Sequence, residues 1–352
     1  MELRNLLAEA VERDASDLHL KTGQPPIFRV HGRLLRSQYP PLPAETVKEL
    51  VYSMLSEQQI RRFEDFHELD LAVPFPPKAR FRVNVYHQQE KVGAALRLIP
   101  LQVRTIDELG LPQTLKTISL RPRGLVLVTG PTGCGKSTTL AAAVDYINEN
   151  TAKHVITIED PMEYSHSDKL CAITQREIGI DTKSYANALR HVMRQNPDVI
   201  LVGEMRDLET MSLTITAAET GHLVFSTLHT VDATQTVDRI IDAFDPDQQE
   251  QIRLQLSVTL EAVFSEQLLP TADGKGRIAV FEILIATSPV RALIRAGRTY
   301  QLPSVIQGGG EVGMQTLDQG LVDLYRRNIV TYEEALAKSS NPREFEHLAR
   351  KA

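Results

Sequence analysis

The chain has 352 residues, of which 42% are hydrophobic and 24% charged, and its formal net charge is −6. This composition is typical of a soluble globular protein long enough for two domains, and no apolar run approaches the roughly 20 residues that span a bilayer. Two cysteines, Cys134 and Cys171, exclude a disulfide framework and a structural zinc ribbon, and they suit a reducing cytosol.

The first part of the chain mixes helical and extended patterns, which predicts an N-terminal α/β domain over residues 1–115. We expect helical structure at 3–13 and 43–66, and strands at 17–20, 27–30, 79–86 and 92–99. Residues 101–123 have a connector-like pattern with prolines at 112 and 122, and we place the linker at 116–123.

From Gly124 onward, short apolar runs alternate with helical stretches. The expected strands are 125–129, 154–159, 199–203 and 223–228. Spacings of this size require crossover helices and predict a mostly parallel sheet, in a second domain that covers 124–352.

A phosphate-binding loop follows the first of these strands. The stretch 130–137 has the pattern Gly, four residues, Gly-Lys-Ser, and it opens a helical stretch. Backbone N–H groups and the helix dipole would hold phosphates there. Lys136 would reach the β- and γ-phosphates, and the Ser137 hydroxyl would hold Mg²⁺. The expected nucleotide-binding residues are Gly130, Pro131, Thr132, Gly133, Cys134, Gly135, Lys136, Ser137 and Thr138.

Polar residues also follow the other three strands, and ligands of doubly wound sheets bind beyond the carboxyl ends of the strands. Asp160 and Glu163 follow 154–159, Glu204 follows 199–203, and His229 follows 223–228. Glu204 would organise Mg²⁺ and the attacking water, and Glu163 and Glu204 are both candidates for the general base, with Glu163 preferred. His229 could bind the γ-phosphate, whereas His222 lies at the opposite end of its strand.

These segments, taken in order, resemble the secretion ATPase superfamily of type II secretion and type IV pilus motors. The resemblance rests on the loop at 130–139, on Ile158-Glu159-Asp160-Pro161-Met162-Glu163, on Val202-Gly203-Glu204-Met205-Arg206-Asp207, and on Thr220-Gly221-His222 with Ser226-Thr227-Leu228-His229. It implies an N-terminal PAS-like domain, a RecA-like P-loop NTPase domain with a C-terminal helical region, the ligands ATP and Mg²⁺, and a homohexameric ring.

Within this superfamily the chain is most similar to the retraction ATPases of type IV pili. Residues 289–295 match most of that family's C-terminal signature, including Arg291, Leu293, Ile294 and Arg295, but depart from it at Ala292 and Ala296. Taken alone, the segment predicts a helix capped by Ser288, with Arg291, Arg295 and Arg298 on one face.

The resemblance also suggests arginines that reach a neighbour's phosphate. The candidates are Arg82 and Arg97 in the N-terminal domain, and Arg190 and Arg194 one helical turn apart in the second. Surface ion pairing is the alternative role for each of them.

The sequence thus predicts a cytoplasmic Mg²⁺-dependent ATPase that powers pilus retraction, and hence twitching motility, through an inner-membrane platform protein. It would dock peripherally, without inserting into the membrane. An accessory pilus ATPase, a small-molecule P-loop kinase and a nucleic-acid translocase are the alternatives. All six net negative charges fall within 116–352, which argues against nucleic acid as a partner.

Overall fold

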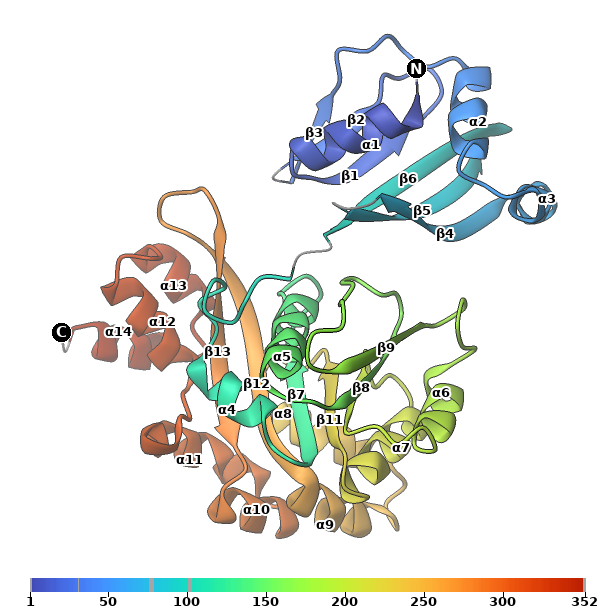
Figure 1. Ribbon diagram of the computed structural model, residues 1–352. Coiled ribbons are helices and arrows are strands. Elements are labelled where there is room, and N and C mark those ends of the chain that lie inside the picture. Colours follow the sequence, from blue (N-terminus) through green and yellow to red (C-terminus); the bar gives the residue numbers. More distant parts are fainter. Residues whose placement is uncertain (1, 31, 76–78, 101–102, 351–352) are drawn as a thin grey trace. The chain divides into compact units, whose positions relative to one another are not determined.

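The computed structural model describes residues 2–30, 32–75, 79–100 and 103–350, and Figure 1 shows its elements along the chain. The chain divides into two compact units. Unit 1 comprises Met1–Gln102 and Glu163–Ser165, and unit 2 comprises Val103–Met162 and His166–Ala352.

Unit 1 is an antiparallel sheet covered by helices. Its strands are ordered β3-β2-β1-β6-β5-β4, and every neighbouring pair runs antiparallel. Fully buried side chains such as Leu6, Leu18 and Phe28 form its core. The elements are α1 (Leu3–Glu12), β1 (Ala15–Leu20), β2 (Ile27–Val30), β3 (Arg33–Arg36), α2 (Ala44–Tyr52), α3 (Glu57–Phe66), β4 (Glu68–Phe75), β5 (Ala79–Gln88) and β6 (Lys91–Pro100).

Two features of unit 1 differ from the sequence expectation. The helical stretch 43–66 is two helices, because Ser56 starts α3 with a capping box. The Ser56 hydroxyl accepts from the Gln59 backbone N–H, and the Gln59 side-chain oxygen accepts from the Ser56 backbone N–H. Strands β3 and β4 were not expected. In β4 the buried Leu69 and Leu71 alternate with exposed residues, which is the pattern of a half-buried strand.

Unit 2 is built around a seven-stranded sheet in the order β13-β12-β7-β11-β10-β8-β9, and only the β12–β13 pair is antiparallel. The four expected strands are β7 (Gly124–Thr129), β8 (His154–Glu159), β10 (Val199–Val202) and β11 (Leu223–Leu228). They lie side by side and parallel, which confirms the predicted mostly parallel α/β fold. The added strands are β9 (Ala172–Glu177), β12 (Leu260–Pro270) and β13 (Arg277–Ile285).

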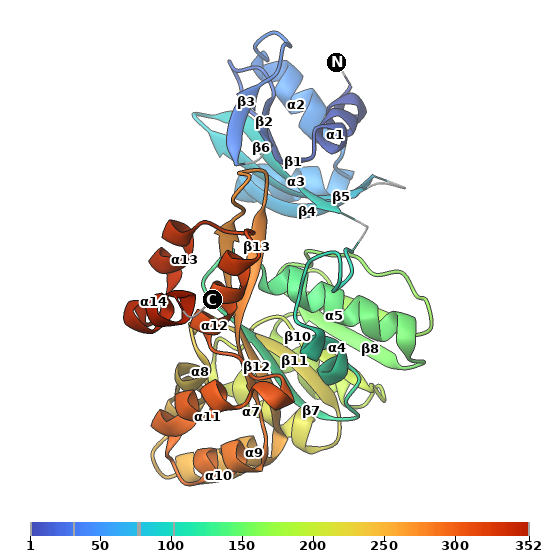
Figure 2. The ribbon, with the colours of Figure 1, turned by 90° about the vertical axis from the view of Figure 1, so that its left-hand side faces the viewer.

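Helices cover both faces of this sheet, as Figures 1 and 2 show. One face packs against α4 (Gln113–Ser119) and α5 (Lys136–Asn150). The other packs against α6 (Tyr185–Val192), α7 (Leu208–Glu219), α8 (Ala233–Asp242), α9 (Gln249–Thr259), α10 (Ser288–Arg295) and α11 (Leu302–Gly308). Alternate residues of β7 divide between the two cores: Leu125 and Leu127 face one, and Val126 and Val128 face the other. Both faces are therefore apolar, as a parallel sheet requires.

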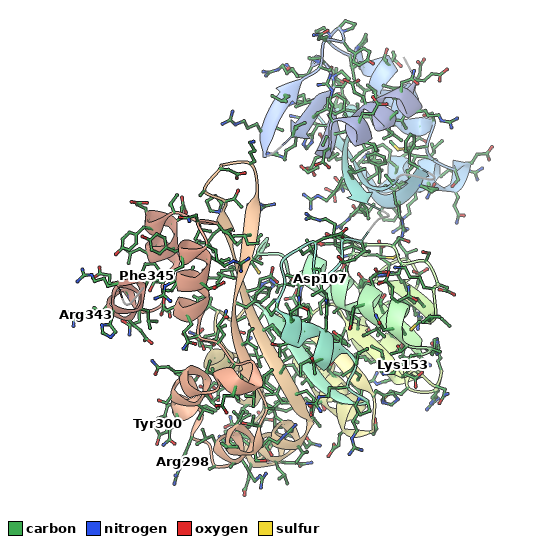
Figure 3. All side chains as sticks on the ribbon, turned by 60° about the vertical axis from the view of Figure 1, so that its left-hand side comes forward. Asp107, Lys153, Arg298, Tyr300, Arg343 and Phe345 are labelled. Atoms are coloured by element: carbon green, nitrogen blue, oxygen red, sulfur yellow. The ribbon has the colours of Figure 1, made fainter. Side chains whose placement is uncertain are left out.

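The C-terminal helices form a separate apolar cluster at the far end of the β12–β13 hairpin. They are α12 (Leu317–Arg326), α13 (Tyr332–Lys338) and α14 (Pro342–Arg350). Phe345, labelled in Figure 3, is fully buried among them and packs with Leu269 of β12. None of the helices in the described parts of the chain is long and apolar enough to cross a membrane.

Candidate active site

The phosphate loop has a backbone that requires glycine. It connects β7 to α5, and Gly130, Gly133 and Gly135 all have positive φ angles, of 140°, 80° and 114°. At Gly130 and Gly135 there is also no room for a side chain, because a Cβ atom would overlap the backbone carbonyl or the carboxylate of Glu266 on β12. These glycines therefore allow the loop to lie directly on β12.

Lys136 turns back over the loop. Its Nζ donates to the carbonyl oxygens of Gly130, at 2.7 Å, and Pro131, at 3.1 Å. Ser137 and Thr138 occupy the first turn of α5 and are half-buried. An ammonium group and a helix N-terminus thus lie at the same loop, and this combination is suited to binding phosphate oxygens.

Glu204 is the centre of a hydrogen-bonded group at the tips of β10 and β11. Its Oε1 accepts from Nε2 of His229 at 2.9 Å, and its Oε2 accepts from Nε of Arg206 at 2.8 Å. The side chain of Glu204 is 16% exposed. Backbone hydrogen bonds fix the surrounding turns: Gly203 N donates to the Ile158 carbonyl and Met205 N donates to the Thr227 carbonyl.

The loop and this carboxylate group are joined through β11. Gly130 N donates to the carbonyl of Leu228, the residue before His229, at 3.3 Å. Successive contacts therefore connect the loop, His229 and Glu204 at one edge of the sheet. The structure brings together the candidate side chains that follow three of the four strands.

The remaining candidates differ in their surroundings. Asp160 is exposed after β8, and its charge acts on Arg206 and Tyr185 beside the Glu204 group. Glu163 is also exposed and belongs to unit 1, so its role as general base stays a prediction. His222 precedes β11, at the end opposite His229, and its Nδ1 is 2.8 Å from the Ala217 carbonyl. That contact fastens the end of α7 to the start of β11, which is a structural role.

The arginine candidates differ in their surroundings. In unit 1, Arg82 of β5 pairs in register with Arg97 of β6, and Arg97 forms an ion pair with Asp17 at 3.0 Å. In unit 2, Arg190 of α6 forms an ion pair with Glu209 of α7.

Arg194 does not share a helix with Arg190, contrary to the sequence expectation. The helix α6 ends at Val192, because the chain turns at 193–196 and Asn196 adopts a positive φ of 53°.

The signature segment forms α10, with two corrections. Its N-cap is Thr287 instead of Ser288, and the helix ends at Arg295, so Arg298 lies beyond it. Arg298 and Tyr300 extend outward in Figure 3, and Tyr300 is 71% exposed. Ile294 is fully buried, Leu293 packs beside it, and Arg295 is exposed.

Two site residues were not predicted from the sequence, although one of them lies within the segment 202–207 that carries the family resemblance. One is Arg206, the second partner of Glu204. The other is Tyr185, the first residue of α6, whose hydroxyl lies so close to Gly203 that a Cβ there would come within 2.7 Å of it. Burial, with the nearby carboxylates of Asp160 and Glu204, raises the pKa of Tyr185. The tyrosine therefore stays a neutral hydrogen-bond donor beside the acidic group.

Known proteins resemble this chain over nearly its full length. A family model described as "Type II/IV secretion system protein" matches residues 2–278. The type IV pilus retraction ATPase PilT of Pseudomonas aeruginosa is 47% identical over 98% of this chain and 100% of its own length. The type IV pilus ATPase PilU of the same organism is 44% identical over 97% of this chain and 89% of its own. A crystal structure of the pilus retraction motor PilT with bound ADP superposes with a TM-score of 0.92, at 44% identity, covering 99% of both chains.

Proposed function

This chain belongs to the type II/IV secretion system protein family, and we propose that it is a hexameric ATP-hydrolysing motor that drives retraction of type IV pili. The observation that carries the proposal is the geometry at the strand tips. The phosphate loop is hydrogen-bonded through Gly130 to Leu228, and the next residue, His229, holds the Glu204 carboxylate together with Arg206. Relatives named as pilus retraction ATPase and pilus retraction motor support the biological assignment.

In the proposed motor, the loop amides and Lys136 bind the nucleotide phosphates. The residues fit Mg²⁺, which keeps several water ligands and is held by few protein oxygens together with the phosphates. Ser137 Oγ and Glu204 would supply those oxygens, and the cation would neutralise charge on the phosphates. His229 donates from Nε2 to the Glu204 carboxylate, which fixes the orientation of the oxygens that would position the attacking water.

The rest of the assignment follows the family. The motor would be cytoplasmic, would assemble as a homohexamer, and would act on an inner-membrane pilus platform protein, to which it would dock. Glu163 is our proposed general base, and Arg82, Arg97, Arg190 and Arg194 are the proposed arginines that act on a neighbouring site. An accessory pilus ATPase is the second candidate, because identity to PilU is 44%, close to the 47% for PilT.

Phosphate release from ATP by the purified full-length protein tests the proposal. We expect Mg²⁺-dependent turnover, and a loss of about 100-fold or more in Lys136→Ala and Glu204→Ala, because each removes charge stabilisation or water positioning. Glu250→Ala, an exposed change on α9 outside the site, is the matched control. Wild-type rates in Lys136→Ala would contradict the assignment.

A cellular assay separates the two pilus roles. Expression of this chain in a retraction-deficient strain restores twitching motility if it is the main motor. An accessory ATPase would restore motility only when another retraction ATPase is present.

A further inference from the structure

A buried carboxyl group lies directly behind the phosphate loop and has no part in the site described above. Glu266 is on β12, which lies between β13 and β7 in the sheet of unit 2, and is 2% exposed. Its Oε2 accepts from the hydroxyl of Thr139, in the first turns of α5, at 2.8 Å. Its other carboxyl oxygen fills the space that a side chain at Gly135 would need.

The backbone of Glu266 also supports the loop, since its carbonyl oxygen occupies the space beside Gly130. Glu266 therefore contacts both glycines that bound the loop, and the helix that follows it. Glu266 leaves no room for a Cβ at two of the three positive-φ glycines of the loop, with the Cys134 sulfur also close at Gly130, whereas Gly133 has no atoms within 4 Å of a Cβ position.

Few charged groups face this carboxyl. Among the described residues, Lys136 of the loop is the charged group that favours its ionised form, and the Cys134 thiol is the titratable group beside it. The paired strand β7 has no titratable residue. Glu282 of β13 belongs to the opposite face of the sheet, where it accepts from the Ala233 backbone of α8. The helices α8 and α13 contribute no charge that shifts the Glu266 pKa.

Burial dominates these effects and raises the pKa of Glu266 to about 7. The ionised and neutral forms of the group are therefore both accessible near neutral pH. The Cys134 thiol does not compete in this range, because burial and Glu266 raise its pKa further above its ordinary value.

We propose that Glu266 is a positioning residue of the phosphate loop whose negative charge opposes that of bound phosphates, so that nucleotide binding takes up a proton at this carboxyl. The inference depends on the proposed function, because it assumes that a nucleotide binds at the loop. Phosphate charge in front of the loop disfavours ionised Glu266 behind it. By linkage, protonation of Glu266 strengthens nucleotide binding by the same factor.

Calorimetry of ADP binding to the full-length protein, without divalent cations, tests the proposal. From pH 6 to pH 8 we expect the wild-type Kd to rise about three- to tenfold more than that of Glu266→Gln, since the amide keeps the Thr139 contact and cannot ionise. Titrations at pH 7.5 in buffers of different ionisation enthalpy should show more proton uptake by the wild type. Subtraction of the Glu266→Gln values removes the titration of ADP itself.

Two further variants keep the test specific. Glu282→Gln removes a half-buried carboxyl from the opposite face of the sheet, and its proton uptake should equal that of the wild type. Thr139→Val removes the donor that lowers the Glu266 pKa, so the midpoint of the pH dependence should move to higher pH. A purely structural role for Glu266 would not move that midpoint.

The outcomes separate the inference from the proposed function. No ADP binding by the wild type would contradict the proposed function. ADP binding with equal proton uptake by the wild type and Glu266→Gln would overturn the role of Glu266 and leave the proposed function intact. Should Glu266→Gln fold poorly, an unmoved midpoint in Thr139→Val would equally overturn it.

Discussion

Single carboxyl groups on the β12–β13 hairpin are held in surroundings that favour their neutral form. Glu282 is half-buried, and this burial together with the carboxylates of Asp232 and Asp318 raises its pKa to about 7. Its Oε1 accepts from the Ala233 N–H, at the start of α8. No ion pair of the described residues includes Glu282. The raised pKa therefore makes the free energy of unfolding depend on pH between about 4.5 and 7, where ordinary carboxyl groups are already ionised.

The sign follows from the raised pKa. An unfolded glutamate ionises near pH 4.5, whereas folded Glu282 stays protonated to about 7. Its contribution to stability is present below pH 4.5 and is lost as the pH rises to about 7. Glu282→Gln should therefore be about 2 kcal/mol more stable than the wild type at pH 8 and nearly equal to it at pH 4.5. Urea unfolding at both pH values measures this, and equal differences at the two values would contradict it.

At the scale of elements, α10 is fixed to its neighbours by one arginine. Arg291 Nη1 donates to the carbonyls of Ser257 and Val258, at the end of α9, and Nη2 pairs with Glu261 of β12 at 2.6 Å. Val290 and Ile294 bury the apolar face of the helix. The signature segment is therefore in part a joint between α9, α10 and β12.

Loss of this joint should destabilise unit 2. Arg291→Ala leaves two helix-end carbonyls and a largely buried carboxylate with fewer donors, and should cost about 1–3 kcal/mol. Arg295→Ala, one turn further along and exposed, should change stability by less than about 0.5 kcal/mol. Denaturant unfolding of the two variants compares them, and equal losses would show that Arg291 is no anchor.

The strand tips were the most predictable part of the site, because parallel strands bring the residues that follow them to one edge. Glu204 and His229 were found in this way, and Lys136 by the spacing of its motif. Arg206 was within the segment 202–207 but was given no role, although it is only two residues from Glu204. Tyr185 and Glu266 were not found, because each acts through a neighbour that only the folded chain brings close. Helix ends were predicted less well: α6 ends at Val192, so Arg194 lies in the turn at 193–196, and the chain leaves α10 before Arg298.

At the scale of the whole molecule, the chain consists of two units with separate cores. Two of the proposed arginines are in each unit, and Arg97 and Arg190 are held by acidic partners on their own unit. In a ring, such groups would act on a site of the adjacent protomer, which makes hydrolysis a property of the assembly.

Mixed rings test whether an arginine acts across the protomer boundary. Arg190→Ala and Lys136→Ala should each be inactive alone, while co-assembled rings should regain about a quarter of the wild-type rate, because an intact loop then meets an intact arginine by chance. The measurement is ATP turnover by rings purified through two different tags. Failure to regain activity would place the arginine in its own protomer's site, and Arg295→Ala mixed with Lys136→Ala serves as the reference.

One inner strand links three distant parts of unit 2. Along β12, Glu261 is bonded to α10, Glu266 lies behind the phosphate loop, and Leu269 packs among the C-terminal helices. Strands on both sides pair with β12 along most of its length, so a displacement of the phosphate loop would be shared by all three parts. Amide hydrogen exchange at the two ends of β12 should then change together when the loop moves.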